Sequence, residues 1–428
     1  MTRAAHTTAP DSSATPREAP ALSTPRGMRL FIGLFGRRNA GKSSLLNALT
    51  GQSLAIVSPR AGTTTDPVEK AMELLPLGPV VLIDTAGVDD EGELGALRVD
   101  RTRRAFDRTD LAIVVAEAGQ WSQFEEDLVD EFTRRRTPLI VAINKVDLTP
   151  VSQTAPADAL AARLRERGLA VVSLSARTGQ GLDDLRSALI ERAPESHFSD
   201  RPILADLIGP GSLALLVTPI DKQAPRGRLI LPQVQTIRDL IDGEAHALVT
   251  TTSSLPGALE HLKAPPAIVV TDSQAFREVA ALLPEDQPLT SFSILFARLK
   301  GDLATQAMGA RAIEHLRPGD RVLIAEACAH HPSQEDIGRV KIPRWLNQKA
   351  GGELDFTTVQ GRDFPDDVTP YSLVIHCGAC TFNRRAMLSR IEQCRRQNVP
   401  ISNYGLAIAA LNGILERALK PFPETRCT

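Results

Sequence analysis

The sequence predicts an α/β protein with three consecutive domains. Its 428 residues correspond to about three domains at roughly 150 residues each. Apolar strand-like runs alternate with helix-like stretches from residue 28 onward, which is the pattern of parallel sheets with helical crossovers. Hydrophobic residues make up 43% of the chain, so each domain has enough apolar side chains to bury a core.

Charge and composition exclude several classes of protein. The net charge is −2, from 49 basic and 51 acidic side chains, which gives no overall field for nucleic acid. No run reaches the roughly 18 apolar residues of a membrane span, and the N-terminus lacks the apolar core of a signal peptide. Residues 1–27 are rich in Ala, Ser, Thr and Pro and are predicted to form a disordered tail. We therefore expect a protein without membrane or nucleic-acid partners.

The cysteines indicate a local thiol site. All five lie in the last quarter of the chain, whereas a disulfide framework would spread and pair them. This distribution favours a reducing, cytoplasmic compartment.

The first motif is a phosphate-binding loop. Residues 28–35 (MRLFIGLF) form an apolar strand, and the helix-like SLLNALTG follows the segment Gly36–Ser43 (GRRNAGKS). This matches G-x-x-x-x-G-K-S/T in its strand–loop–helix context. The glycines let backbone N–H groups approach phosphates at a helix N-terminus. Lys42 is expected to reach the β- and γ-phosphates and Ser43 to hold magnesium. The nucleotide-binding residues expected here are Gly36, Asn39, Ala40, Gly41, Lys42, Ser43 and Ser44.

Three downstream motifs, each at the end of an apolar strand, predict the base and the metal. Asp84 and Gly87 in VVLIDTAG fit a second-shell magnesium carboxylate and a backbone sensor of the γ-phosphate. In LIVAINKVD, the Asp147 carboxylate can accept from guanine N1–H and the 2-amino group, whereas adenine would leave that charge unpaired. Asn144 and Lys145 belong to the same motif. Ser175 and Ala176 in VVSLSAR would turn their backbone toward the guanine oxygen.

These motifs resemble those of the GTPase branch that contains Era, MnmE and Der. Its second motif, Gly-Thr-Thr-Arg-Asp, compares with Gly62-Thr63-Thr64-Thr65-Asp66 here. The resemblance implies that Thr64 reaches magnesium, while Thr65 departs from the pattern. It also implies that Asn39 binds potassium; the alternative is a turn residue with an unusual φ. Val88 replaces the water-positioning glutamine of Ras-like enzymes, so slow hydrolysis is expected, with Lys42, Thr64 and Asp84 as the catalytic residues.

The middle region, residues 196–290, carries no recognisable chemistry. Residues 212–221 predict a buried strand, and Leu231, Val234, Ile237, Leu240 and Ile241 share one face of the helix that follows. Such a pair suits a sheet-edge contact between subunits, but an ordinary domain core explains it equally well.

Thiol and imidazole groups end two strands of the last region. RVLIAEA, residues 321–327, leads into Cys328 and His330, and SLVIHC, residues 372–377, contains His376 and Cys377 and leads to Cys380. Ligand sites form at the carboxyl ends of parallel strands. The 45 residues between the two histidines leave room for a helical crossover, so the strands are expected to be neighbours.

Spacing alone leaves the nature of this thiol site open. A bare Cys-x-x-Cys suits a redox pair. A third cysteine on another strand favours either a Cys₃His zinc site or an iron–sulfur cluster with one variable ligand. Cys394 lies on a helix-like stretch and is expected to be a core or surface thiol, and Cys427 lies near the end of the chain.

The combination of GTPase motifs with Cys-x-His, a gap of about 45 residues and His-Cys-x-x-Cys resembles the HydF family, the GTPase maturases of FeFe-hydrogenase. The resemblance implies a P-loop GTPase domain at residues 28–195, an α/β dimerisation domain at 196–290 and an α/β cluster-binding domain at 291–428. It implies a 4Fe–4S cluster on Cys328, Cys377 and Cys380, with His330 and His376 as candidate exchangeable ligands.

The family's role is to carry a di-iron precursor, built by radical-SAM maturases, to apo FeFe-hydrogenase. The cofactors implied are GTP, magnesium, potassium and the cluster, and the oligomer implied is a homodimer. The alternative is an Era- or Der-like GTPase with a zinc-stabilised RNA-binding domain. That alternative predicts a basic face with stacking aromatics, whereas aromatic residues are only 4% of the chain.

Overall fold

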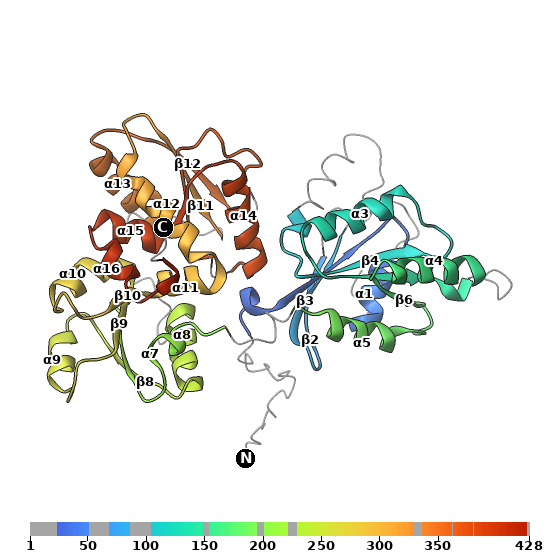
Figure 1. Cartoon of the computed structure of the whole chain (residues 1–428), viewed down its shortest axis with the longest axis horizontal. Helices are drawn as coiled ribbons and strands as arrows, with labels where there is room; N and C mark the ends of the chain where they lie inside the picture. Colours follow the sequence, from blue (N-terminus) through green and yellow to red (C-terminus); the bar gives the residue numbers. More distant parts are fainter. Residues whose placement is uncertain are drawn as a thin grey trace, which may run out of the picture.

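The structure, a computed structural model, contains three sheets that follow one another along the chain (Figure 1). It describes residues 24–50, 68–85, 104–148, 154–194, 201–220, 229–327, 336–361, 363–379 and 381–425. The predicted α/β class is confirmed in all three domains. Most of the expected tail lies outside the described residues; its last part enters a 3-10 helix, η1, Arg26–Met28.

The first domain is built on a six-stranded sheet in the order β2-β3-β1-β4-β5-β6. All neighbours are parallel except β2 and β3. Two hydrophobic cores cover its two faces. The elements are β1 Leu30–Phe35, α1 Lys42–Thr50, β2 Val68–Leu74, β3 Gly78–Asp84, β4 Leu111–Glu117, α3 Gln123–Arg134, β5 Leu139–Asn144, η2 Val146–Leu148, α4 Thr154–Glu166, β6 Ala170–Ser173 and α5 Leu182–Arg192.

The second domain has a parallel four-stranded sheet in the order β10-β9-β7-β8. The strand predicted at 212–221 is β7, and it lies between two neighbours rather than at an edge. Its LALLV sequence is apolar throughout, as expected for a strand buried on both faces. The elements are α7 Ala205–Ile208, β7 Leu213–Val217, α8 Leu231–Asp242, β8 His246–Thr250, α9 Leu255–Glu260, β9 Ile268–Thr271, η4 Ser273–Ala275, α10 Phe276–Ala281, β10 Leu289–Ser291 and α11 Phe292–Lys300.

The third domain repeats this design in the order β12-β11-β13-β14. All strands are parallel, and β11 pairs directly with β13. The expectation that the two thiol-bearing strands are neighbours is therefore confirmed. The elements are α12 Leu303–Arg311, η5 Ala312–His315, β11 Arg321–Glu326, η6 Ile337–Lys341, α13 Ile342–Ala350, β12 Asp355–Gln360, β13 Leu373–His376, α14 Arg384–Arg396, β14 Ile401–Asn403, α15 Tyr404–Leu411, α16 Leu415–Leu419 and η7 Pro423–Thr425.

One hydrophobic core joins the second and third domains. It runs from β7 and β9 through α11 and α12 to α15 and α16. The two domains accordingly form one lobe in Figure 1. The boundary expected at residue 290 falls inside β10, and α11 continues from that strand.

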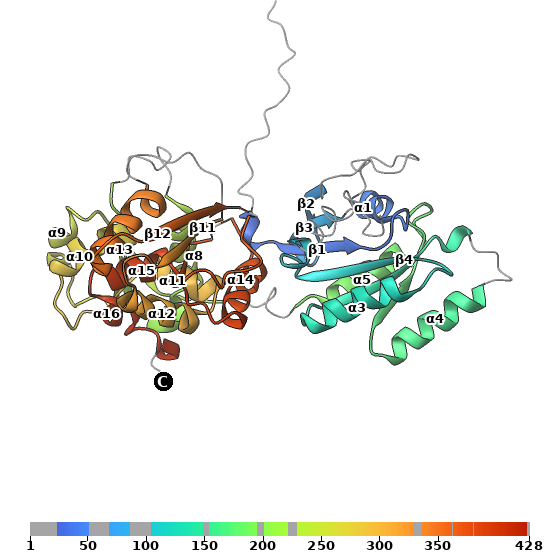
Figure 2. The ribbon, with the colours of Figure 1, turned by 90° about the horizontal axis from the view of Figure 1, so that it is seen from above.

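The first domain meets the third domain along α14 (Figures 1 and 2). The Asn383 amide donates to the Arg108 carbonyl at 2.9 Å and to the Asp110 carboxylate at 3.0 Å. The Ser389 hydroxyl donates to Asp107 at 2.9 Å, and Arg385 donates to Thr137 at 2.6 Å. The segment after Cys380 is thus attached to the amino ends of the strands in the first sheet.

None of the described helices is long and apolar enough to cross a membrane.

Candidate functional site

The phosphate loop joins β1 to α1 and depends on two glycines. Gly36 has φ +148°, and a Cβ there would lie 2.2 Å from the Val115 carbonyl oxygen of β4. Gly41 has φ +94°, and a Cβ there would lie 2.2 Å from the Asn144 amide nitrogen. Neither position has room for a side chain. Asn39 also takes a positive φ, 61°, which asparagine tolerates, and it is exposed.

Lys42, the first residue of α1, folds back over the loop. Its ammonium donates to the carbonyls of Gly36 at 2.8 Å and Arg37 at 2.6 Å, and the side chain is 6% exposed. Ala40 is buried, while Ser43 and Ser44 follow in the first turn of α1 and are half-buried. The expected loop residues therefore lie together at the helix N-terminus, where backbone N–H groups and the helix dipole favour phosphate.

Asp84 at the end of β3 fits the expected magnesium site. Its Oδ2 accepts from the Ser43 hydroxyl at 2.5 Å, and its Oδ1 is buried without a hydrogen-bond partner among the described residues. Burial raises the pKa of Asp84, against the lowering effects of Ser43 and Lys42. A divalent cation held by Ser43 would compensate this buried carboxylate.

Asn144 connects the phosphate loop to the base-binding loops. Its side chain is 2% exposed, donates to the Ala40 carbonyl at 2.9 Å and accepts from the Ala176 N–H at 3.0 Å. Ser175 is fully buried and its hydroxyl accepts from the Thr178 N–H at 3.2 Å. Asn144 therefore links the phosphate loop, its own loop after β5 and the loop after β6 through side-chain hydrogen bonds. Its predicted role is then not limited to contacting the base.

Lys145 and Asp147, predicted to contact guanine, lie directly after β5. Lys145 has φ 64°, and its ammonium lies 2.7 Å from the Glu117 carboxylate. Asp147 is paired with the exposed Arg177 guanidinium at 3.1 Å. Thr64 and Gly87, the other two residues predicted for this site, lie outside the described residues.

Replacing Asp147 with asparagine is expected to weaken the preference for GTP over ATP by a few kcal/mol. The amide presents donors where guanine N1–H and its amino group need an acceptor. The ratio of GTP to ATP affinity, measured by fluorescent nucleotide displacement, tests this. Replacing the exposed Asp183 of the same domain with asparagine serves as the control. If the wild-type protein bound GTP and ATP with equal affinity, the guanine assignment would be rejected.

A second group of candidate residues lies at the carboxyl edge of the third sheet. The Cys377 sulfur, just after β13, accepts from the Ala327 N–H at 3.0 Å, just after β11. The Thr381 hydroxyl donates to the Ala327 carbonyl at 3.3 Å. Ala327 directly precedes Cys328 and Thr381 directly follows Cys380. The chain neighbours of Cys328 and Cys380 therefore contact each other, and the neighbour of Cys328 also contacts Cys377.

The other ligands predicted for this edge are outside the described part of the chain: Cys328, His330 and Cys380. Within the described part, no group of three His, Cys, Asp or Glu side chains is placed to hold a metal ion. His376 is described and is fully buried, with both ring nitrogens in hydrogen bonds to Cys377 and Arg390. We call the carboxyl edge of the third sheet, around Cys377, Ala327 and Thr381, the thiol edge. His376 does not present a free nitrogen there.

Cys394 is a core thiol on α14. It is fully buried, and burial raises its pKa to about 12. We therefore expect iodoacetamide at pH 8 to leave Cys394 unmodified in the folded protein and to modify it in urea, because the thiolate is the reactive form. Peptide mass spectrometry measures this; rapid modification of the folded chain at Cys394 would contradict it.

Comparison with known protein families identifies the family of the chain. Residues 203–301 match the hydrogen maturase F dimerization domain and residues 304–421 match the hydrogen maturase F tetramerization domain. The two matches together span about half of the chain. The chain belongs to the HydF family. Residues 31–145 match the family described as 50S ribosome-binding GTPase, so this HydF protein is a GTPase that binds GTP and magnesium.

Individual relatives match the GTPase part of the HydF chain. The tRNA modification GTPase MnmE of Bordetella parapertussis is 36% identical over 180 residues, 41% of this chain and 36% of that protein. MnmE of Roseiflexus sp. is 42% identical over 161 residues, 36% of this chain and 33% of that protein. The chain thus spans about a third of the length of these relatives. Aquifex aeolicus Era bound to GDP·AlF4⁻ covers 59% of this chain and 97% of its own, at 20% identity and a TM-score of 0.36.

Several residues of this HydF chain matter to the two sites and have no motif. Arg37 in the phosphate loop pairs with Glu125 at 2.7 Å, within the capping box of α3. Lys300 of α11 is 2% exposed and donates to the carbonyls of Ala379 and Phe382 on either side of Cys380. A lysine within an apolar helical stretch, such as Lys300 in FSILFARLK, is the one signal that sequence reading offers for such roles.

Proposed function

We propose that this HydF-family GTPase binds a 4Fe–4S cluster through Cys328, Cys377 and Cys380 and carries a di-iron precursor to apo FeFe-hydrogenase. One observation supports this most directly. The Ala327 N–H donates to the Cys377 sulfur, and the Ala327 carbonyl accepts from Thr381. These bonds connect Cys377 with Ala327, the neighbour of Cys328, and Ala327 with Thr381, the neighbour of Cys380.

The donor set suits a cluster that accepts further ligands. Three thiolates on a 4Fe–4S cluster leave one iron with a replaceable ligand, the open position that a carried metal fragment needs. The protein supplies the thiolates and a backbone N–H to the Cys377 sulfur, a kind of hydrogen bond that tunes such centres. Cys377 is half-buried, so the edge is accessible to a partner.

In the GTPase domain, Lys42 and Ser43 are positioned to neutralise the phosphates and hold magnesium, with Asp84 behind the metal. Thr64 and Gly87 complete that set in our proposal. Hydrolysis is slow because Val88 stands where Ras-like enzymes place glutamine. Lys145 and Asp147 select guanine.

The proposed assembly is a homodimer that meets radical-SAM maturases and the hydrogenase in turn. Its contact would use the edge strand β8 and helix α8 rather than the central β7. Val234 and Ile241 of α8 are 47% and 56% exposed, and Val249 of β8 is 42% exposed. The mass of the full chain in solution, measured by light scattering, tests the proposed oligomeric state. A monomer at all concentrations would contradict the homodimer.

Iron and sulfide analysis of the full chain after anaerobic reconstitution tests the cluster. We expect about four irons and four sulfides per chain, with the electron paramagnetic resonance (EPR) spectrum of a reduced 4Fe–4S centre. A protein that holds one zinc and no iron would reject the proposal.

Asn39 carries a separate prediction about potassium. We propose that it binds this ion beside the phosphates, where a second cation stabilises the charge that develops during hydrolysis. GTP hydrolysis is expected to be faster in potassium chloride than in sodium chloride, and Asn39→Ala is expected to remove the difference. Phosphate release assays in the two salts measure it. Equal rates for the wild type would eliminate the potassium site.

A further inference from the structure

A buried guanidinium lies behind the thiol edge of the third domain. Arg390 of α14 is 8% exposed and lies between two aromatic rings, 4.5 Å from the centroid of Phe382 and 4.7 Å from that of Phe364. Its Nη1 lies 2.7 Å from the Nε2 of His376, and its Nη2 donates to the Gly361 carbonyl at 2.6 Å. Each face and both ends of the guanidinium are therefore fixed.

His376 is fully used in holding this guanidinium. Because Arg390 has only donors, the Nε2 of His376 must accept, so the proton is on Nδ1 and is donated to the Cys377 carbonyl at 2.9 Å. An iron ligand would need one of these two nitrogens.

The charge of Arg390 is not cancelled by a direct carboxylate contact among the described residues. Its two hydrogen-bond acceptors are both uncharged. Burial lowers its pKa to about 10, and the nearby Cys377, Asp107 and Asp363 act against this lowering. Asp363 itself pairs with Arg104 at 3.6 Å.

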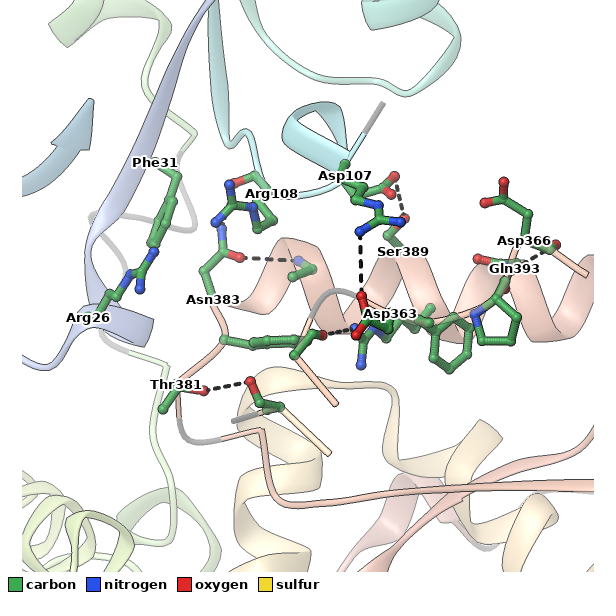
Figure 3. A pocket seen from close by; sticks show the side chains of 18 residues that line it. Arg26, Phe31, Asp107, Arg108, Asp363, Asp366, Thr381, Asn383, Ser389 and Gln393 are labelled. Atoms are coloured by element: carbon green, nitrogen blue, oxygen red, sulfur yellow. Dashed lines mark hydrogen bonds and ion pairs between the residues drawn. The ribbon is translucent and has the colours of Figure 1, made fainter. Parts of the chain in front are cut away.

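The surroundings connect this cation to the proposed cluster edge. Arg390 lines a cavity of about 390 Å³ between the first and third domains, together with Ala327 and Thr381 (Figure 3). These are the neighbours of Cys328 and Cys380 in the chain. Cys377 follows His376 directly. A thiolate-bound cluster carries net negative charge, and a buried cation is the group that compensates such charge in a low-dielectric site.

We propose that Arg390 and His376 form a cationic support for the cluster, in which Arg390 balances the charge of the thiolate-bound centre and His376 positions Arg390 instead of binding iron. This inference rests on the proposed function. Because the reduced cluster is one charge more negative than the oxidised one, Arg390 stabilises the reduced form more and raises the reduction potential.

The test uses the full chain, reconstituted without oxygen, in the wild type and four variants. Arg390→Gln removes the charge and Arg390→Lys keeps it. His376→Gln keeps an acceptor without an imidazole nitrogen. Arg396→Gln is the control, an exposed arginine on the same helix that pairs with Glu392. Redox titration followed by EPR gives the potential, and pulsed EPR of ¹⁵N-histidine-labelled protein detects nitrogen bound to iron.

We expect Arg390→Gln to shift the potential to more negative values, Arg390→Lys to shift it less and Arg396→Gln to leave it unchanged. His376→Gln is expected to leave any iron–nitrogen coupling of the wild type unchanged. An unshifted potential in Arg390→Gln, or loss of an iron–nitrogen coupling in His376→Gln, would overturn the inference while the cluster itself stands. If Arg390→Gln fails to fold, the His376→Gln spectrum still decides. A wild type without a 4Fe–4S signal would reject the proposed function and this inference together.

Discussion

Changing Cys377 to serine is expected to abolish the 4Fe–4S cluster and the activation of apo FeFe-hydrogenase, while GTP hydrolysis persists. The proposed site has three thiolates, and a hydroxyl is a poor ligand for iron in such a cluster. The loss also removes the sulfur that accepts from the Ala327 N–H, one of the contacts that join the chain after β11 to the chain after β13. Iron and sulfide content, EPR and a hydrogenase-activation assay on one preparation measure the effect.

Hydrolysis persists because the two sites are built on different sheets. Cys377 follows β13 in the third sheet, whereas the phosphate loop lies at the carboxyl edge of the first. The contacts between these domains include those of α14 and its N-cap Asn383 with the amino ends of the first sheet, and the ion pair of Arg104, which precedes β4, with Asp363. The phosphate loop lies at the opposite, carboxyl edge of that sheet. A fall in hydrolysis comparable to the loss of iron would show that the variant is damaged as a whole.

Cys394→Ala is the matched control for this variant. Cys394 is a cysteine of the same domain, fully buried on α14, and alanine removes only one heavy atom from the core. We expect full cluster content at a cost of roughly 1 kcal/mol in the free energy of unfolding.

A Cys377→Ser protein that still activates the hydrogenase would show that the precursor is carried somewhere other than the cluster.

The strands of the first domain were predictable because their sequences are unusually clear. Buried parallel strands are apolar on both faces, and LFIGLF of β1 and LIVAIN of β5 are buried at every position. Each is followed at once by a polar motif, which marks the strand end. The predicted positions of Lys42, Ser43, Asp84 and Asn144 follow from that rule.

The arrangement of the second domain was not predictable in the same way. The face assigned to α8 from helical spacing is split, since Leu240 is fully buried while Val234 and Ile241 are exposed. Helical spacing predicts that these residues share one side of α8. It does not predict how much of that side the rest of the domain covers. The central position of β7 depends on pairing with β8 and β9, which are distant in sequence.

The thiol edge shows a further limit of sequence reading. The resemblance to the HydF family implied His376 as a candidate exchangeable ligand, and its position next to Cys377 agrees with that prediction. Successive side chains of a strand point to opposite faces, however, and His376 is the last residue of β13. Its partner Arg390 lies 14 residues later on another element. A side-chain contact between two separate elements depends on how they pack, so no local sequence pattern predicts it.

Changing Lys42 to alanine is expected to reduce GTP hydrolysis by about 10²–10³-fold, the usual effect of losing one preorganised charge at a phosphate site. In the structure the ammonium is buried over the loop and donates to Gly36 and Arg37, so it is already held where phosphates would bind. Single-turnover hydrolysis and nucleotide affinity, measured separately, show how the loss divides between binding and the chemical step.

The appropriate control is Lys70→Ala, a lysine of the same domain on the edge strand β2. It is expected to leave hydrolysis unchanged, because β2 pairs with β3 on the side of the sheet away from β1 and carries no motif. The cluster content of Lys42→Ala is expected to equal that of the wild type, since the ammonium donates to Gly36 and Arg37 of the phosphate loop, in a different sheet from Cys377. A Lys42→Ala protein that hydrolyses GTP at the wild-type rate would show that Gly36–Ser43 is not the phosphate site, whatever the outcome at the cysteines.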